Sequence, residues 1–115
     1  MTALITRDEL KAKLDRGDDL VILEALPPMY YADAHLPGAL NFPHDQVDRL
    51  ARELLPDKDR EIVVYCSNTA CPNSGIAANR LVALGYGNVR KYAEGKQDWI
   101  EAGLPTERGS AVASR

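Results

Sequence analysis

The stretch that decides the fold is EIVVYCSNTACPNSGIAANRLVALG, residues 61–85. Its first part, residues 62–65, is a β-branched and aromatic run, which predicts a buried strand ending at Cys66. Its last part has apolar residues at helical spacing and stops at Gly85, a residue that favours the left-handed conformation after a helix. Ser74 is the predicted N-cap of this helix, because a serine oxygen accepts a hydrogen bond from the first helical turn.

A strand, a thiol, a polar loop and a helix in this order predict an anion-binding site with a nucleophile at its rim. In open α/β sheets, ligands bind beyond the carboxyl ends of the strands, and the free N–H groups of a following helix attract anions. The same field lowers the pKa of a thiol, so we expect Cys66 to be a catalytic thiolate rather than an inert buried thiol. The predicted anion cradle consists of Ser67, Asn68, Thr69, Ala70, Cys71, Pro72, Asn73 and Ser74.

Length and composition predict a single globular domain and exclude several function classes. The 115 residues are 45% hydrophobic and 27% charged, enough for one core but too few for a separate cofactor domain. The net charge of -3, with basic residues scattered among acidic ones, argues against nucleic acid or an anionic membrane as a partner. No apolar run approaches the roughly 20 residues of a membrane span, and the N-terminus lacks a signal-peptide core, so we expect a cytoplasmic protein.

The rest of the chain predicts strands that alternate with helices. A capping box of Thr6 and Glu9 opens a predicted helix over residues 7–16, which Gly17 closes. Further predicted helices lie within residues 29–34, 45–56 and 97–102, and further predicted strands within residues 20–23, 40–42 and 89–92. This alternation predicts an α/β fold with a mainly parallel sheet of about five strands and helices on both faces. The domain is expected to cover residues 1–105, and the small, polar residues 106–115 a flexible tail.

A set of short motifs runs through nearly the whole chain. These motifs are VILE (21–24), HLPGALN (35–41), VVYC (63–66), LGYGNV (84–89) and AGLP (102–105), together with Gly95 and Trp99. Their order and spacing resemble those of the single-domain rhodanese-like proteins, a family of sulfurtransferases.

The resemblance implies a parallel sheet flanked by helices and a nucleophilic Cys66. This cysteine would take a sulfane sulfur from a donor such as thiosulfate or a low-molecular-weight persulfide. The outer sulfur of the resulting persulfide would then be transferred to cyanide, glutathione or a protein thiol. No metal or other cofactor would be needed. Related phosphatase-like members need an arginine where this chain has Pro72, so we discount a phosphatase.

Two features of the loop favour an alternative of another class. The loop from Cys66 to Ser74 is two residues longer than is usual in the family, and it carries no charged side chain. The alternative is a non-catalytic rhodanese-like module that binds a partner or senses oxidants through Cys66 and Cys71. Two roles for Cys71 stay open: a resolving thiol that is the redox partner of Cys66, or a residue that packs the loop.

A wall of the predicted pocket is expected from the segment that follows the strand over residues 20–23. The predicted wall residues are Glu24, Met29, Tyr30, Tyr31 and His35. We expect His35 to form structural hydrogen bonds, because no third residue is visible that would orient it as a base. No metal site is predicted, because the two cysteines are at the edge of ligand spacing and the histidines lie far from them in sequence.

Overall fold

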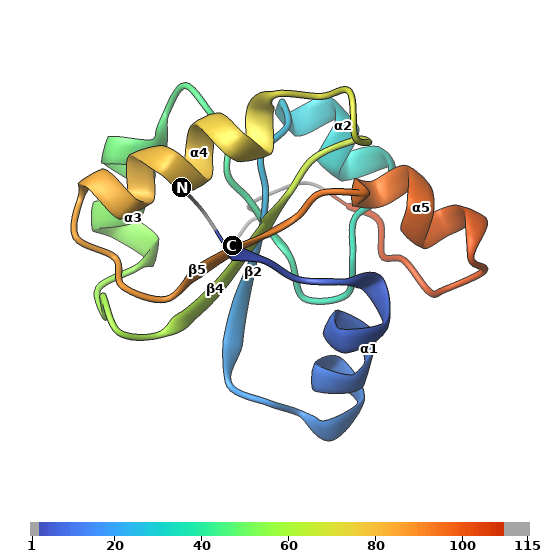
Figure 1. Ribbon diagram of the computed structural model, residues 1–115. Helices are drawn as coiled ribbons and strands as arrows, with labels where there is room; N and C mark the ends of the chain where they lie inside the picture. The colour runs from blue at the N-terminus through green and yellow to red at the C-terminus, as the bar shows by residue number, and fades with distance from the viewer. Residues whose placement is uncertain (1–2, 110–115) are drawn as a thin grey trace.

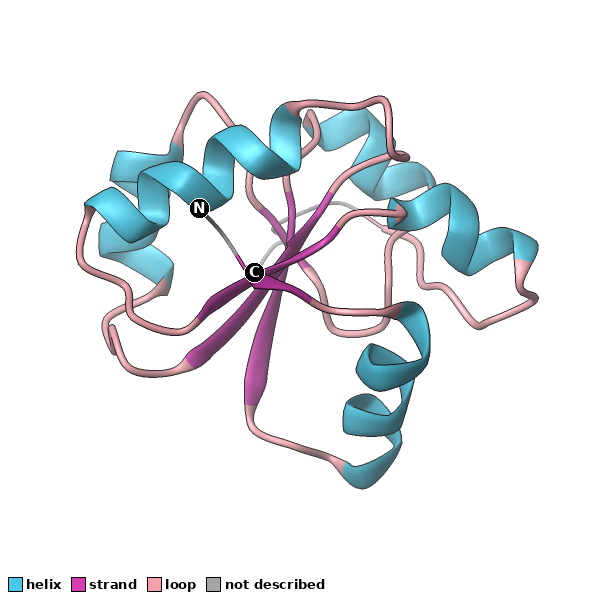
Figure 2. Cartoon of the chain, in the orientation of Figure 1, coloured by secondary structure: helices cyan, strands magenta, loops and turns pink. Residues whose placement is uncertain are grey.

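The computed structural model describes residues 3–109, and within them one parallel sheet carries helices on both faces (Figures 1 and 2). The strands are β1 (Ala3–Leu4), β2 (Leu20–Glu24), β3 (Leu40–Asn41), β4 (Glu61–Tyr65) and β5 (Val89–Tyr92), in the order β1-β5-β4-β2-β3. The helices are α1 (Arg7–Arg16), α2 (Pro28–Asp33), α3 (Val47–Leu54), α4 (Asn73–Ala83) and α5 (Gly95–Glu101). All neighbouring strands are parallel, so the predicted fold class is confirmed.

Alternation of side chains along the central strands creates two hydrophobic cores. Ile62 and Val64 of β4 pack with α3 and α4, whereas Val63 and Tyr65 pack with α1 and α5 on the opposite face. Figure 1 shows α3 and α4 together on one side of the sheet and α1 and α5 on the other. With both faces covered, β4 is buried along nearly its whole length, as its continuous apolar sequence requires.

Most predicted elements are found within two or three residues of their predicted bounds. The strand that the sequence does not reveal is β1, because its two residues pair with Arg90 and Lys91 at the sheet edge and show no pattern. The predicted N-cap at Ser74 is wrong. Pro72 occupies that position, so the helix begins two residues earlier and leaves the Ser74 hydroxyl free for another contact.

The segment after α5 returns along the protein to α2. The backbone N–H of Glu107 donates to the His35 carbonyl, that of His35 donates to the Glu107 carbonyl, and that of Gly109 donates to Ala32. The predicted domain boundary after residue 105 therefore falls inside a hydrogen-bonded segment, and 110–115 of the predicted tail lie outside the described residues. Within residues 3–109, no helix combines the length and apolarity needed to cross a membrane.

Candidate active site

The candidate nucleophile lies where β4 runs into the loop that precedes α4 (Figure 1). Cys66 is the residue directly after β4, and only 1% of its surface is exposed. Its Sγ lies 3.4 Å from the carbonyl oxygen of Cys71, which can accept its proton, and 3.5 Å from the hydroxyl oxygen of Ser74. The thiol is therefore enclosed by the loop rather than standing at an open rim.

Cys71 provides a second sulfur at the same place. It is half-buried, and its sulfur accepts hydrogen bonds from the Cys66 thiol and from the backbone N–H groups of Asn73 and Ser67. The backbone N–H of Ser74 donates to the Cys66 sulfur instead. Three of the predicted cradle N–H groups thus converge on the two sulfur atoms.

The other part of the predicted cradle forms a local turn. The backbone N–H of Cys71 donates to the Asn68 carbonyl at 3.1 Å, and that of Ala70 donates to the Asn68 side chain at 3.0 Å. The Asn68 amide in turn donates to Gln97 of α5 at 3.1 Å. The N–H groups of Ala70 and Cys71 are therefore bonded within the loop and are not available to an anion, so the cradle has fewer donors than predicted. Thr69 and Pro72 lie on the exposed side of the loop.

The two thiols differ in acidity, and the difference is the reverse of the predicted one. Burial raises the pKa of Cys66, and its hydrogen bond to Cys71 acts in the same direction. Burial also opposes ionisation of Cys71, but hydrogen bonds from Cys66, Asn73 and Ser67 outweigh it and lower the pKa of Cys71. The prediction of a lowered pKa for Cys66 is wrong, because burial and the hydrogen bond to Cys71 outweigh the hydrogen bonds from Ser74.

This order of acidity predicts which thiol reacts first with an alkylating reagent. In the reduced protein near neutral pH, iodoacetamide should modify Cys71 before Cys66, because Cys71 is both more acidic and more exposed. Peptide mapping of partly alkylated protein measures the order. In urea-unfolded protein the two rates should become similar, and faster labelling of Cys66 in the folded protein would contradict the assigned acidities.

A buried ion pair connects α5 to the end of β2. Glu24 is fully buried and accepts hydrogen bonds from the Tyr65 hydroxyl at 2.6 Å and from the Lys96 ammonium at 3.1 Å. Lys96 also donates to the carbonyl oxygens of Tyr30 and Ala34, at 2.9 and 2.6 Å. Burial raises the pKa of Glu24, although the hydrogen bond from Tyr65 and the charge of Lys96 act against it.

The N-terminus of α5 also holds the backbone around Cys66. The N–H groups of Lys96 and Gln97 donate to the carbonyl oxygens of Cys66 and Ser67, both at 2.8 Å. Gly95 makes this approach possible: its φ is 75°, and a Cβ atom placed on it would lie 2.6 Å from the Cys66 oxygen. A residue with a side chain would therefore force α5 away from the loop.

Replacing Gly95 by Ala is expected to lower the free energy of unfolding by about 2–3 kcal/mol, because left-handed strain and the contact with Cys66 add together. Two controls separate these causes. Gly38→Ala has the same positive φ but no atom near its Cβ, and Gly87→Ala has neither problem. Urea unfolding should rank the losses as Gly95, then Gly38, then Gly87, and equal losses at Gly95 and Gly38 would contradict the close contact.

The predicted pocket wall is not assembled as expected. Glu24 is at the predicted edge of the sheet, but strand alternation turns it to the face that carries Tyr65, away from the Cys66 and Ser74 contact. Met29 and Tyr30 are 71% and 52% exposed on α2.

The two remaining wall residues are structural. Tyr31 and His35 are buried and stacked, with ring centroids 3.8 Å apart. The Tyr31 hydroxyl donates to the Ala39 carbonyl, and His35 Nδ1 lies 2.8 Å from the Tyr31 carbonyl. Among residues 3–109, no group of three or more His, Cys, Asp or Glu side chains is placed to hold a metal ion.

Instead of α2, helix α5 borders the hollow next to the loop. This hollow, of about 300 Å³, is lined by Ser67, Lys96, Gln97, Ile100 and Glu101. Sequence reasoning gave no role to Lys96. A lysine in the first turn of a helix interacts unfavourably with the helix dipole, which indicates that its charge is needed by another contact.

Lys91 is a second cation that sequence reasoning missed. Its ammonium lies 3.6 Å from the place that a Cβ of Gly75 would take, beside the first turn of α4. Strand β5 thus brings a positive charge to the helix end that follows the neutral loop. Only the pairing of β5 with β4 reveals this neighbour, since Lys91 is 25 positions from Cys66 in sequence.

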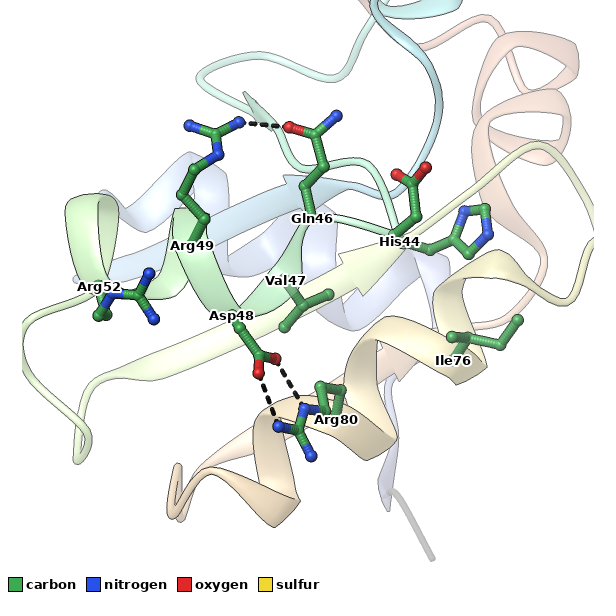
Figure 3. A pocket seen from close by; sticks show the side chains of 9 residues that line it. His44, Gln46, Val47, Asp48, Arg49, Arg52, Ile76 and Arg80 are labelled. Carbon is green, nitrogen blue, oxygen red and sulfur yellow. Dashed lines mark hydrogen bonds and ion pairs between the residues drawn. The ribbon is translucent and has the colours of Figure 1, made fainter.

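A separate hollow of about 590 Å³ lies between α3 and α4 (Figure 3). Arg80 of α4 makes two hydrogen bonds of 2.7 Å to Asp48 of α3 across it. Neither cysteine lines this hollow, and its ion pair is exposed, so it does not belong to the candidate active site.

Comparison with known proteins agrees with this geometry. The rhodanese-like domain family matches residues 6–102. A protein named sulfurtransferase from Allochromatium vinosum is 30% identical over 101 residues, covering 88% of this chain and 91% of that protein. An HTH-type transcriptional regulator of Mycobacterium tuberculosis is 35% identical over 94% of this chain, which spans only 46% of that regulator.

A solved structure supports the same relationship. The rhodanese-like domain of a protein from Anabaena sp. is 32% identical and has a TM-score of 0.81, with 94% of this chain and 80% of that chain covered. The family match covers strands β2 to β5, the loop with both cysteines, and α1 through α5. The chain therefore belongs to the rhodanese-like domain family.

Proposed function

We propose that this chain is a sulfurtransferase that carries a sulfane sulfur as a persulfide on Cys66. The observation that supports this most directly is the pair of Ser74 groups at the Cys66 sulfur, its backbone N–H and its hydroxyl at 3.5 Å. Both are donors to a negatively charged sulfur, so they would stabilise a thiolate and the persulfide anion that replaces it. Membership in the family and similarity to a named sulfurtransferase support the same chemistry.

In the first step, the Cys66 thiolate attacks the outer sulfur of a donor such as thiosulfate or a low-molecular-weight persulfide. A sulfur–sulfur bond forms at Cys66, the donor's own sulfur–sulfur bond breaks, and sulfite or a thiolate leaves with the electron pair. Because Cys66 has a raised pKa, loss of its proton precedes the attack. Lys91 and the first turn of α4 would attract an anionic donor electrostatically.

In the second step, an acceptor attacks the outer sulfur of the Cys66 persulfide and Cys66 leaves as a thiolate. Cyanide, glutathione or a thiol on a partner protein are acceptors of suitable chemistry. The enclosure of Cys66 makes this step dependent on opening the loop, since only 1% of its surface is exposed. No cofactor takes part in either step.

Intact-protein mass spectrometry after incubation with thiosulfate tests the proposal. Reduced Cys71→Ser protein, in which no second thiol can discharge Cys66, should gain the mass of one sulfur, the added sulfur should map to Cys66, and cyanide should remove it as thiocyanate. A parallel incubation with glutathione persulfide separates a poor thiosulfate site from an absent activity. If neither donor adds sulfur to Cys66, the chain is not a sulfurtransferase.

A second candidate function is a redox-sensing module without transfer activity. The contact between the Cys66 thiol and Cys71 favours it, because oxidation could join the two sulfurs with little movement. The similarity to a transcriptional regulator twice as long is consistent with such a module. Under this candidate, dilute peroxide should remove two hydrogens from the protein while sulfur donors leave its mass unchanged.

A further inference from the structure

The two sulfur atoms of the site share one hydrogen-bonded environment. Cys66 Sγ lies 3.4 Å from the Cys71 carbonyl oxygen, and interaction between the two thiols raises the pKa of Cys66 and lowers that of Cys71. The chain has already turned back between them, since the Cys71 N–H donates to the Asn68 carbonyl at 3.1 Å. The two residues are therefore already neighbours within one short loop, and the entropy cost of joining them is small.

The surroundings of Cys71 are those of a reactive thiol rather than a packing residue. A packing cysteine would be buried among apolar side chains, whereas Cys71 is half-buried and its sulfur accepts the N–H groups of Asn73 and Ser67. These donors favour its thiolate form. Cys66 is the opposite case, a protonated thiol that is almost fully enclosed.

We propose that Cys71 discharges the Cys66 persulfide within the chain, releasing sulfide and leaving a disulfide between Cys66 and Cys71. This inference rests on the proposed function, because it needs a persulfide on Cys66. An external acceptor must open the loop to reach Cys66, whereas Cys71 belongs to that loop and its carbonyl oxygen lies 3.4 Å from Cys66 Sγ. The intramolecular reaction is therefore favoured over attack by a dilute external thiol.

The step balances without an added oxidant. The Cys71 thiolate attacks the inner sulfur, Sγ of Cys66, and forms the bond between the two Sγ atoms. The bond from Cys66 Sγ to the outer sulfur breaks, and the outer sulfur leaves with the electron pair and one proton as HS⁻. The sulfane sulfur is reduced by two electrons, and the two cysteines are oxidised by two. A dithiol, or two molecules of a low-molecular-weight thiol, restores both cysteines for the next cycle.

A single-turnover experiment in the absence of oxygen tests this step. Reduced protein, freed of reductant, receives thiosulfate and no acceptor, and samples are analysed over time by intact mass and by sulfide trapping with monobromobimane. The wild-type protein should release one sulfide per chain and lose two hydrogens, with a disulfide mapped to Cys66 and Cys71. The variant Cys71→Ser should keep the persulfide on Cys66 and release sulfide at least about tenfold more slowly.

Matched variants separate this role from a general effect on the loop. Val82→Ala alters an exposed side chain of α4, outside the loop, and should behave as wild type. Cys71→Ala serves as a second variant without a thiol at position 71. Circular dichroism checks that Cys71→Ser and Cys71→Ala both fold. If Cys71→Ser discharges its persulfide as fast as wild type, or if the wild-type persulfide persists, the inference is overturned while the sulfurtransferase proposal stands. If Cys66 never gains sulfur in wild type or variant, the proposed function fails and the inference with it.

Discussion

Replacing Cys66 by Ser should reduce sulfur transfer from thiosulfate to cyanide by about a thousandfold or more, because no other residue can form the persulfide at the Ser74 donors. The substitution keeps a small polar group in contact with Ser74 and Cys71, so the fold should be retained. This result would distinguish the two thiols, because the variant still contains Cys71, the more acidic and more accessible one. Thiocyanate formation measures the loss.

The comparison with Cys71→Ser makes the assignment specific. With excess cyanide, Cys71→Ser should retain transfer, because cyanide attacks the outer sulfur of the Cys66 persulfide once the loop opens and needs no thiol at position 71. If Cys66→Ser retained transfer and Cys71→Ser lost it, the nucleophile would be Cys71, and the stabilising role of Ser74 would have to be abandoned. If both variants lost transfer, the two thiols would act as one unit.

The sequence was sufficient to predict the central strand, the helix after the loop, and the position of Cys66 between them. Residues 62–65 form a continuous apolar run and residues 76–84 have helical spacing, and both signals arise from contacts with the same core. The order of strands and helices then limits the topology to a parallel α/β sheet. The resemblance to the rhodanese-like family was confirmed, and it rested on motifs spread over most of the chain.

The features that the sequence did not reveal depend on contacts between distant segments. The pKa of Cys66 is raised chiefly by its burial within the loop, which the hydrogen bonds from Ser74 do not outweigh. Pro72 at the start of α4 moved the helix boundary and released Ser74 to contact Cys66. Lys96 meets Glu24 across 72 positions of sequence, so no local pattern connects them.

Replacing Lys96 by Met should lower the free energy of unfolding by about 3–5 kcal/mol at neutral pH, because it leaves the fully buried Glu24 carboxylate without its charged partner. The carbonyl oxygens of Tyr30 and Ala34 lose a donor in the same variant. Lys11→Met is the matched control, because Lys11 pairs with Asp15 at the surface and its loss should cost less than about 1 kcal/mol. Urea unfolding measures both values.

The loss in Lys96→Met should depend on pH in a defined direction. Burial already raises the pKa of Glu24 above its ordinary value of 4.5, and removal of Lys96 raises it further. Above pH 4.5 the folded variant then binds more protons than the unfolded chain, so its free energy of unfolding falls as the pH rises. The difference from wild type should therefore be smallest below pH 4.5 and grow toward neutral pH. Adding Glu24→Gln to the variant should abolish this growth, because glutamine does not ionise, and a loss that stayed constant with pH would show that the Glu24 charge is not its cause.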